Sequence, residues 1–294
     1  MKYTNHHNLP DEIIRAIEND QYDKGDSVIS ITGLLQPPRI RLLNKTHEEE
    51  LVEDYSDQIW KILGQSVHTI LERANENYED TITEERYFAQ VMGWKISGQT
   101  DSFSMEDRTL KDYKITSVWT IISASKGGKS DWEQQLNSYA YLHHRVHGES
   151  IEALQIIAIA RDWNKRERQR RGGDYPPSPV SVIDIPLWTF EEQEEFVYTR
   201  VKLHQDWEVK YLMDEILPDC SDEDRWKKDD TWRVMKKGRK SALRVLYSNE
   251  DAEQYIENSE QKGLTIEHAL GEPMRCTGNY CGVAEFCNQF KEEK

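Results

Sequence analysis

The sequence has no long apolar run. No segment approaches the roughly 20 apolar residues that span a bilayer, so we expect no membrane partner. Residues 1–20 are polar and do not resemble a secretory signal peptide. The 294-residue chain is 31% charged, but its 9 Trp and 14 Tyr argue against disorder. These features predict a globular, intracellular protein with room for one large domain or two modest ones.

Excess positive charge is also missing. The chain has 38 basic and 54 acidic residues, a net charge of −16. A domain that binds nucleic acid over its whole surface is usually basic. Any contact with nucleic acid must therefore come from local basic patches.

Cysteine is scarce, and a nucleotide-binding loop is absent. Three of the four cysteines crowd near the carboxyl end, which in a chain without a secretory signal indicates a metal or iron–sulfur centre rather than disulfides. Nothing matches G-x-x-x-x-G-K-[ST], which excludes a helicase-type phosphate loop.

The periodicity of apolar residues predicts an α/β fold with a mixed sheet flanked by helices. The predicted elements are helices at 9–20, 46–78 and 131–147, a strand pair at 84–103, a polar turn at 105–109, strands at 110–116, 154–163 and 180–188, and a helix from Thr189 to about Leu217, ended by Pro218. Two short strands and a helix within 224–257 form a small ββα module. We expect three parts: a core at 1–217, this module at 218–262, and a tail at 263–294 that packs back on the core.

Two carboxylates and a lysine stand where a hairpin would bring them together. Asp101 ends one predicted strand, and Asp112 and Lys114 share one face of the next, since successive side chains alternate. Hydrolysis of a phosphodiester requires carboxylates that hold a divalent cation and a further positive charge near the reacting phosphate. The main-chain carbonyl of Tyr113 would offer another oxygen ligand.

Several neighbours suit the same chemistry. His68 lies one helical turn after Gly64, which would leave room beside the imidazole, and His68 would hold the metal or position a water. Gln135 and Tyr139 share a helix face and would support the lysine or the substrate. Glu85 is the weakest candidate, as a salt-bridge partner or an outer-sphere group.

The ordered series G-x-x-x-H (64–68), G-x-x-D (98–101), D-x-K (112–114) and Q-x-x-x-Y (135–139) resembles the RecB-type branch of PD-(D/E)XK nucleases over residues 27–190. The likeness extends to phage exonucleases and to the CRISPR-adaptation and AddB-type nuclease domains. It implies Mg²⁺ or Mn²⁺ held by His68, Asp101, Asp112 and the Tyr113 carbonyl, with Lys114 as the catalytic cation and Gln135 and Tyr139 in support. It also implies a location in the bacterial cytoplasm, or in that of a bacterial host if a phage encodes the chain.

The cysteines are similar to the iron–sulfur site of several RecB-type nucleases. Cys276, Cys281 and Cys287 lie in the tail, with Cys220 upstream. The likeness favours a 4Fe-4S cluster, but here the lone cysteine follows the core and the first gap is wider than C-x2-C. Four thiolates would equally suit tetrahedral zinc. Either centre would staple the tail to the rest of the chain.

Two basic patches stand out in the acidic chain. The first is a predicted loop next to Trp163, where arginines would clamp phosphates and the indole would stack on a base; it contains Lys165, Arg166, Arg168, Arg170 and Arg171. The second, at 227–240 with Trp226 and Trp232 interleaved, suits single-stranded nucleic acid or an ordinary small sheet equally well.

We therefore expect a metal-dependent deoxyribonuclease that acts as an exonuclease or prefers single strands, in phage or bacterial DNA replication, recombination or repair. Its partner is DNA, with a replication or recombination protein as a further partner. Two alternatives stay open: a catalytically silent nuclease fold that binds DNA or serves in assembly, and an endonuclease. Cleavage polarity, oligomeric state and pathway do not follow from the sequence.

Overall fold

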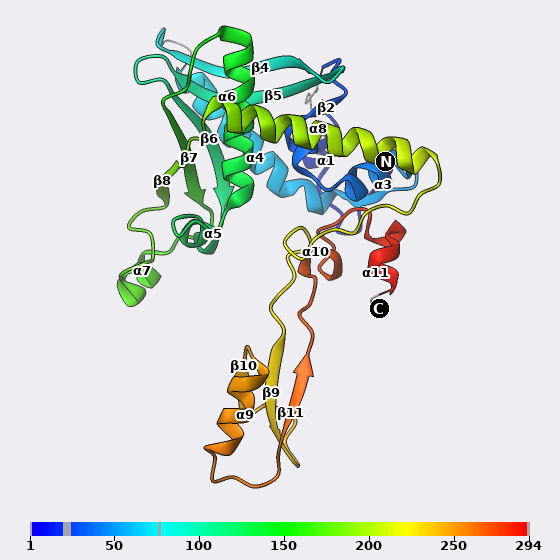
Figure 1. Cartoon of the computed structure of the whole chain (residues 1–294). Helices are drawn as coiled ribbons and strands as arrows, with labels where there is room; N and C mark the ends of the chain where they lie inside the picture. The colour runs from blue at the N-terminus through cyan, green and yellow to red at the C-terminus, as the bar shows by residue number, and fades with distance from the viewer. Residues whose placement is uncertain (1, 20–24, 76–77, 293–294) are drawn as a thin grey trace. The chain divides into compact units, whose positions relative to one another are not determined.

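The fold is described from a computed structural model that places residues 2–19, 25–75 and 78–292 (Figure 1). Contacts between residues divide the chain into two compact units. Unit 1 comprises Met1–Pro38 and Val52–Ile216, and unit 2 comprises Arg39–Leu51 and Leu217–Lys294. None of the helices in the described ranges is both long and apolar enough to cross a membrane.

Unit 1 is built on a mixed sheet, as the sequence predicts. Parallel and antiparallel pairs alternate across it, with β4 on the outer edge of β5. Within the described residues its strands are β2 (Ile29–Ser30), β5 (Trp94–Ser104), β6 (Thr109–Thr116), β7 (Ala153–Ala160) and β8 (Val180–Ile185), in that order, and β4 (Thr81–Val91).

The sheet is open along one short stretch of β5. On the edge away from β4, β2 pairs with Ile96 and Ser97, and β6 pairs with residues 102–104. Between these pairings, residues 98–101 have no strand partner on this edge in the described part of the chain. There the Asp101 carboxylate accepts the main-chain N–H of Tyr113 at 2.6 Å. The opening coincides with the G-x-x-D motif.

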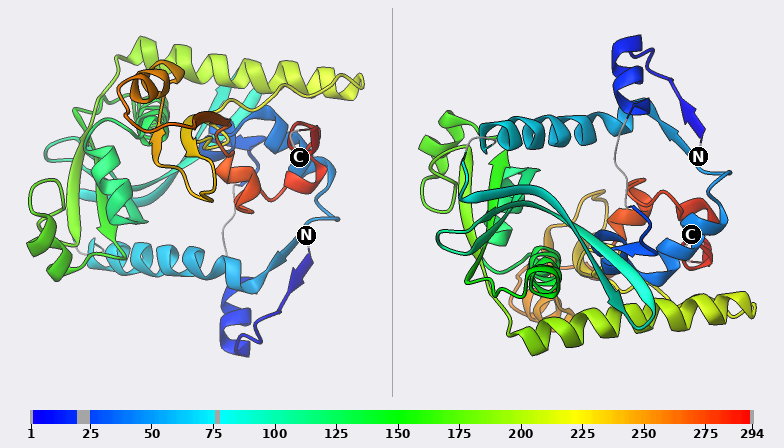
Figure 2. Two further views of the ribbon diagram at one scale, coloured as in Figure 1. Left: turned by 90° about the horizontal axis from the view of Figure 1, so that it is seen from below. Right: turned by 90° about the horizontal axis from the view of Figure 1, so that it is seen from above.

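Three long helices cover this sheet. Figure 2 shows α4 (Ile59–Asn75) on one face and α6 (Ser130–His147) and α8 (Phe190–Leu212) on the other. The apolar side of α6 is buried in the core, and α8 packs against α6. Thr189 begins α8 with a capping box in which Thr189 and Glu192 satisfy each other's main-chain N–H groups, as the sequence predicts.

Shorter elements fill the remaining described residues of unit 1. The pair of β1 with β3 forms a separate two-stranded ladder. These elements are β1 (Lys2–Thr4), α1 (Asp11–Glu18), α2 (Ile31–Leu35), β3 (Val52–Asp54), the 3-10 turn η1 (Tyr55–Gln58), α5 (Val118–Ala124) and α7 (Lys165–Arg171).

Unit 2 contains a three-stranded antiparallel sheet in the order β10-β9-β11, with α9 packed against it (Figure 1). The predicted ββα module is thus joined by a further strand from residues that we had assigned to the tail. Its elements are α3 (Pro38–Thr46), β9 (Thr231–Lys236), β10 (Arg244–Leu246), α9 (Asn249–Glu257), β11 (Leu264–Ala269), α10 (Met274–Thr277), η2 (Ala284–Phe286) and α11 (Asn288–Glu292).

Two predicted helix boundaries are wrong. The helix predicted at 46–78 begins at Ile59, because Asp54 accepts the N–H groups of Ser56 and His6 and fixes a turn there. The long helix after Thr189 ends at Leu212, and Asp214 adopts a left-handed φ of 60°, so the chain leaves the helix before Pro218. Residue 20 of the first predicted helix and residues 76–77 of the second lie outside the described residues.

The predicted basic loop contains a helix, α7. Asn164 caps it: its side-chain oxygen accepts the N–H groups of Arg166 and Glu167 at 2.8 and 3.2 Å. Gly172 ends the helix with a left-handed φ of 58°. Sequence analysis missed it because a seven-residue helix with no apolar stripe leaves no periodic signal.

The core of unit 1 contains an uncharged histidine. His143 on α6 is 1% exposed, and its Nδ1 lies 3.0 Å from the hydroxyl of Tyr87. Burial, with the nearby charges of His147 and Arg108, lowers the pKa of His143 to about 4. An unfolded histidine takes up a proton near pH 6.5, so acidification favours unfolding through this residue.

We expect the unfolding free energy to fall as the pH drops through the interval between these two pKa values. Because the folded pKa is the lower one, His143 should account for a loss of about 2 kcal/mol between pH 7 and about pH 5. His143→Leu should lower stability overall but flatten this slope in urea titrations at several pH values. An unchanged slope in that variant would show that other groups cause the acid sensitivity.

Candidate functional site

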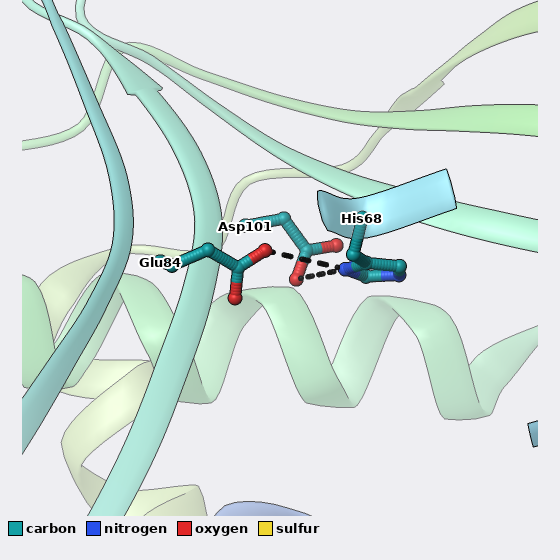
Figure 3. Close-up of side chains that lie close together, drawn as sticks. All are labelled: His68, Glu84 and Asp101. Atoms are coloured by element: carbon teal, nitrogen blue, oxygen red, sulfur yellow. Dashed lines mark hydrogen bonds and ion pairs between the residues drawn. The ribbon is translucent and has the colours of Figure 1, made fainter. Parts of the chain in front are cut away.

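Two carboxylate side chains and one imidazole converge at the opening in the sheet. His68 comes from α4, Glu84 from β4 and Asp101 from β5 (Figure 3). His68 Nδ1 lies 3.4 Å from Glu84 Oε1 and 3.4 Å from Asp101 Oδ1. The three ligand atoms all lie within 4.8 Å of one another, so this group can hold a cation.

Glu84 is a site residue that sequence reasoning missed. It falls between the pairs Thr83↔Ser102 and Glu85↔Thr100, which puts it opposite Asp101. Its φ of 50° is left-handed, a conformation that is costly for glutamate and tends to occur where surrounding contacts fix it. No local sequence pattern marks such a residue.

A chain of hydrogen bonds fixes the Glu84 carboxylate. Gln99 donates to Glu84 Oε2 at 2.8 Å, and Arg86 donates to the Gln99 side-chain oxygen at 2.5 Å. The neighbouring Glu85, which we had considered as an outer-sphere group, lies 3.2 Å from His147 instead. The salt-bridge alternative for Glu85 is therefore the one that the structure supports.

Asp112 and Lys114 share one face of β6, as the i, i+2 spacing predicts. Lys114 Nζ lies 2.7 Å from Asp112 Oδ2, and Asp112 is 3% exposed. Burial raises the pKa of Asp112 to about 6; Lys114 opposes the shift and Asp101 adds to it. Burial alone would lower the pKa of Lys114, but the charge and hydrogen bond of Asp112, with the charges of Asp101 and Asp131, together outweigh it, so the net shift is upward.

His68 sits between two carboxylates. Hydrogen bonds to Asp101 and Glu84 raise the pKa of His68 to about 10, which makes it an imidazolium at neutral pH. The ring of Tyr113 meets it edge-on at 5.8 Å between centroids. A metal ion at His68 must displace a proton, because only the neutral imidazole is a ligand.

Gln135 and Tyr139 bond to each other on α6, where the Gln135 amide donates to the Tyr139 hydroxyl at 2.9 Å. Tyr139 also explains the motif glycine on β5. A Cβ at Gly98 would lie 2.9 Å from the Tyr139 ring, so only glycine permits this packing. A Cβ at Gly64 would meet nothing within 4 Å, so the space beside that helix position is open.

A groove of about 1370 Å³ leads to this group of residues. His68, Glu84, Asp101 and Tyr139 line it, together with Gly64. Asp112 and Lys114 are not among its lining residues; they lie on the strand that follows Asp101. Of the predicted metal ligands, the structure thus gathers His68 and Asp101 with Glu84, while Asp112 contacts Lys114.

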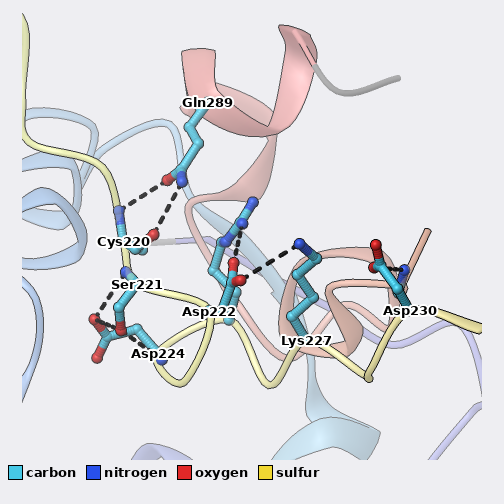
Figure 4. Close-up of polar contacts among 9 residues, drawn as sticks. Cys220, Ser221, Asp222, Asp224, Lys227, Asp230 and Gln289 are labelled. Atoms are coloured by element: carbon cyan, nitrogen blue, oxygen red, sulfur yellow. Dashed lines mark hydrogen bonds and ion pairs between the residues drawn. The ribbon is translucent and has the colours of Figure 1, made fainter. Parts of the chain in front are cut away.

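The four cysteines line one cavity in unit 2. Burial, followed by the charge of Asp224, raises the pKa of Cys220 to about 12, and burial also raises the pKa of Cys281. Gln289 clamps the main chain of Cys220 through two hydrogen bonds of 2.9 and 3.0 Å (Figure 4). Arg39 Nη1 donates to Cys287 Sγ at 3.6 Å.

The spacing of these thiols bears on which metal they suit. A tetrahedral zinc ion with Zn–S bonds of about 2.3 Å holds its sulfur atoms about 3.8 Å apart. Among the described residues, no three of the thiols approach as closely as the ligand atoms of His68, Glu84 and Asp101, which lie within 4.8 Å. In the described part of the chain, no three thiols are therefore gathered as closely as zinc would hold them.

Part of the predicted basic patch is engaged locally, by one carboxylate and by main-chain carbonyls. Arg170 and Arg171 both contact Glu167, at 2.6 and 3.0 Å, and Arg168 donates to main-chain carbonyls of residues 173 and 175. The indole N–H of Trp163 donates to the Pro176 carbonyl at 2.9 Å, and the ring packs against the core. Trp163 is thus held against the core but only partly buried, and its role as a stacking residue stays a prediction.

No protein-family model and no curated protein matches the sequence. Solved structures that are similar to part of it include two of low sequence identity. The crystal structure of SSO0001 covers 68% of this chain and 91% of its own, with 18% identity and a TM-score of 0.45. The crystal structure of a protein named "Putative exonuclease" from Eubacterium rectale covers 67% and 69%, with 13% identity and a TM-score of 0.34. At such low identities and TM-scores, neither likeness establishes a shared fold or activity.

We expect Mn²⁺ binding to release protons. Titration calorimetry near pH 7 in buffers of different ionisation enthalpy should show about one proton released per metal ion, since His68 must deprotonate. The affinity should fall as the pH is lowered, because protons compete for His68 and Asp112. Glu84→Gln should weaken binding, whereas Glu85→Gln, a change at the adjacent position, should not. Equal affinities for these two variants would place the ion elsewhere.

Proposed function

We propose that this protein is a metal-dependent deoxyribonuclease that hydrolyses phosphodiester bonds at the opening between β2 and β6. One observation carries the proposal: His68, Glu84 and Asp101 converge in a groove that they line, and the charges of His68 and Asp101 act on the neighbouring Asp112–Lys114 pair. Carboxylates and an imidazole are ligands suited to Mg²⁺ or Mn²⁺. The PD-(D/E)XK family and its RecB-type branch are the class that this arrangement supports best.

The charge balance of the site supports a cation there. The carboxylates of Glu84, Asp101 and Asp112 lie close together, and ion pairs with Lys114 and His68 compensate them. Hydrogen bonds to the two carboxylates raise the pKa of His68, and the charge of Asp101 adds to the rise that burial causes in the pKa of Asp112. When bound there, Mg²⁺ or Mn²⁺ would polarise a phosphoryl oxygen and lower the pKa of a coordinated water.

Each side chain then has a distinct task. His68, Glu84 and Asp101 hold the cation, with Asp112 and the Tyr113 carbonyl as further ligands of the set. Lys114 places its positive charge beside the reacting phosphate, and Asp112 keeps that charge in position. Tyr139 lines the groove, and Gln135, which donates to the Tyr139 hydroxyl, fixes its position.

Cleavage assays test this function. Lys114→Ala and Asp112→Ala should each lower the rate of Mg²⁺- or Mn²⁺-dependent cleavage of end-labelled DNA by more than about a hundredfold, while the fold is retained. Lys111→Ala is the matched control, because Lys111 lies on the same strand but is not a member of the site. EDTA should abolish cleavage by the wild type.

The product pattern separates the modes of cleavage. Linear DNA degraded from its ends while circular DNA stays intact would show an exonuclease, and cleavage of circles would show an endonuclease. Full activity in Lys114→Ala would refute the site. Metal-independent DNA binding without any cleavage would instead indicate a silent nuclease fold.

We propose further that Cys220, Cys276, Cys281 and Cys287 hold an iron–sulfur cluster. The four thiols share one cavity, no three of them among the described residues are gathered as closely as zinc would hold them, and the buried guanidinium of Arg39 offsets the charge of thiolates. The ligand bonds would tie Cys220 to the three cysteines near the carboxyl end and so stabilise unit 2.

Anaerobically purified protein should show visible absorption of an iron–sulfur centre and about four iron atoms per chain. Cys287→Ser should lose this absorption and melt at a lower temperature. His68→Ala, at the other metal site, should retain the absorption in full. One zinc and no iron per chain in anaerobic samples would replace the cluster with a zinc site.

A further inference from the structure

Two tryptophans in unit 1 are exposed to an unusual degree for so large an apolar side chain. Trp60 at the start of α4 is 58% exposed, and Trp119 at the start of α5 is 59% exposed. Each has a guanidinium over its ring: Arg161 lies 4.5 Å from the centroid of Trp60, and Arg171 lies 4.9 Å from that of Trp119. Each pair therefore presents a flat aromatic surface beside a guanidinium, although that of Arg171 also contacts the Glu167 carboxylate at 3.0 Å.

Both pairs are anchored at the ends of the strands that lead from the candidate active site. The Arg161 N–H donates to the Thr116 carbonyl at 2.9 Å, so Arg161 lies at the end of β6, about 7 Å along the strand from Lys114. The Val118 N–H donates to the Asp162 carboxylate at 2.7 Å, which places Trp119 beside the same turn. Figure 1 shows α5 and α7 at these strand ends.

A path along α4 connects Trp60 with the candidate metal ligands. Trp60, Gly64 and His68 are spaced four residues apart and form one stripe about 12 Å long on the helix. Between the two side chains, Gly64 leaves the helix backbone bare and the space beside it open. The backbone of a bound polymer can therefore approach α4 closely between Trp60 and His68.

The region around the ends of β6 and β7 also carries basic side chains that no carboxylate of the placed residues neutralises. Within the described residues, the side chains of Arg161, Lys165 and Arg166 have no carboxylate partner. In a chain with a net charge of −16, three unpaired cations beside two exposed indoles indicate an anionic, aromatic ligand. Polynucleotide strands have both properties.

We infer that the Trp60–Arg161 and Trp119–Arg171 pairs form a stacking surface for single-stranded nucleic acid, which guides the strand along the Trp60–Gly64–His68 stripe. Bases stack on the two indoles, and the arginines and Lys165 contact the phosphates. A paired duplex hides its base faces and could not use the rings in this way. The inference deepens the proposed function and rests on it for the direction of the strand.

Binding measured without cleavage tests the inference separately. Fluorescence anisotropy of a labelled oligothymidylate and of a blunt hairpin duplex in EDTA reports affinity while metal-dependent cleavage is blocked. Trp60→Ala and Trp119→Ala should each weaken binding of the single strand about tenfold and leave binding of the hairpin unchanged. Trp207→Ala is the matched control, because Trp207 on α8 also carries a cation over its ring, Lys210 at 4.4 Å, but lies away from this region.

A second pair of variants distinguishes stacking from a structural effect. Trp60→Phe should retain most of the affinity for the single strand, whereas Trp60→Leu, which keeps apolar bulk without a ring, should lose it. Wild-type affinity in both alanine variants, equal losses for strand and hairpin, or no binding of single strands by the wild type would each overturn the inference. If the wild type cleaves DNA and the tryptophan variants bind normally, the stacking surface is refuted and the nuclease function stands. If the variants lose binding but neither they nor the wild type cleave DNA, the nuclease function is refuted and the stacking surface stands.

Discussion

The candidate site depends on one hydrogen bond, which the main-chain N–H of Tyr113 donates to the Asp101 carboxylate. In an unbroken sheet, a backbone carbonyl would accept such an N–H group. Here a side chain takes that place, and no strand among the placed residues pairs with residues 98–101 on the edge between β2 and β6. The split lets α4 bring His68 down to the strands. It also sets Asp101 and Asp112 side by side without backbone pairing at that position.

The opening concentrates negative charge in a place that is partly shielded from water. Protein interiors tolerate ionised carboxylates only when other charges or hydrogen bonds compensate them. Lys114 compensates Asp112, His68 compensates Asp101 and Glu84, and Gln99 adds a hydrogen bond to Glu84. This balance explains how Glu84 is kept in a left-handed backbone conformation that glutamate rarely adopts.

The sequence was sufficient to predict the parts of the site that follow from local geometry. The i, i+2 spacing placed Asp112 and Lys114 on one face, and the hairpin after Ser104 brought Asp101 to the same level. Glu84 could not be predicted, because its position depends on an unusual φ and on cross-strand register. The strand β11 was missed since its alternation is weak. The roles of Trp163 and of the basic helix depended on tertiary partners, such as Pro176 and Glu167, that no spacing reveals.

Arg39 has a consequence for how the protein is made. Its guanidinium is almost fully buried and donates to the carbonyls of Leu217 and Pro218 and to the carboxylate of Asp219. These partners lie 178 to 180 residues later in the chain. During synthesis, α3 therefore emerges from the ribosome long before the residues that satisfy its arginine. These contacts of Arg39 cannot form until residues 217–219 have been synthesised, so unit 2 is completed late in translation.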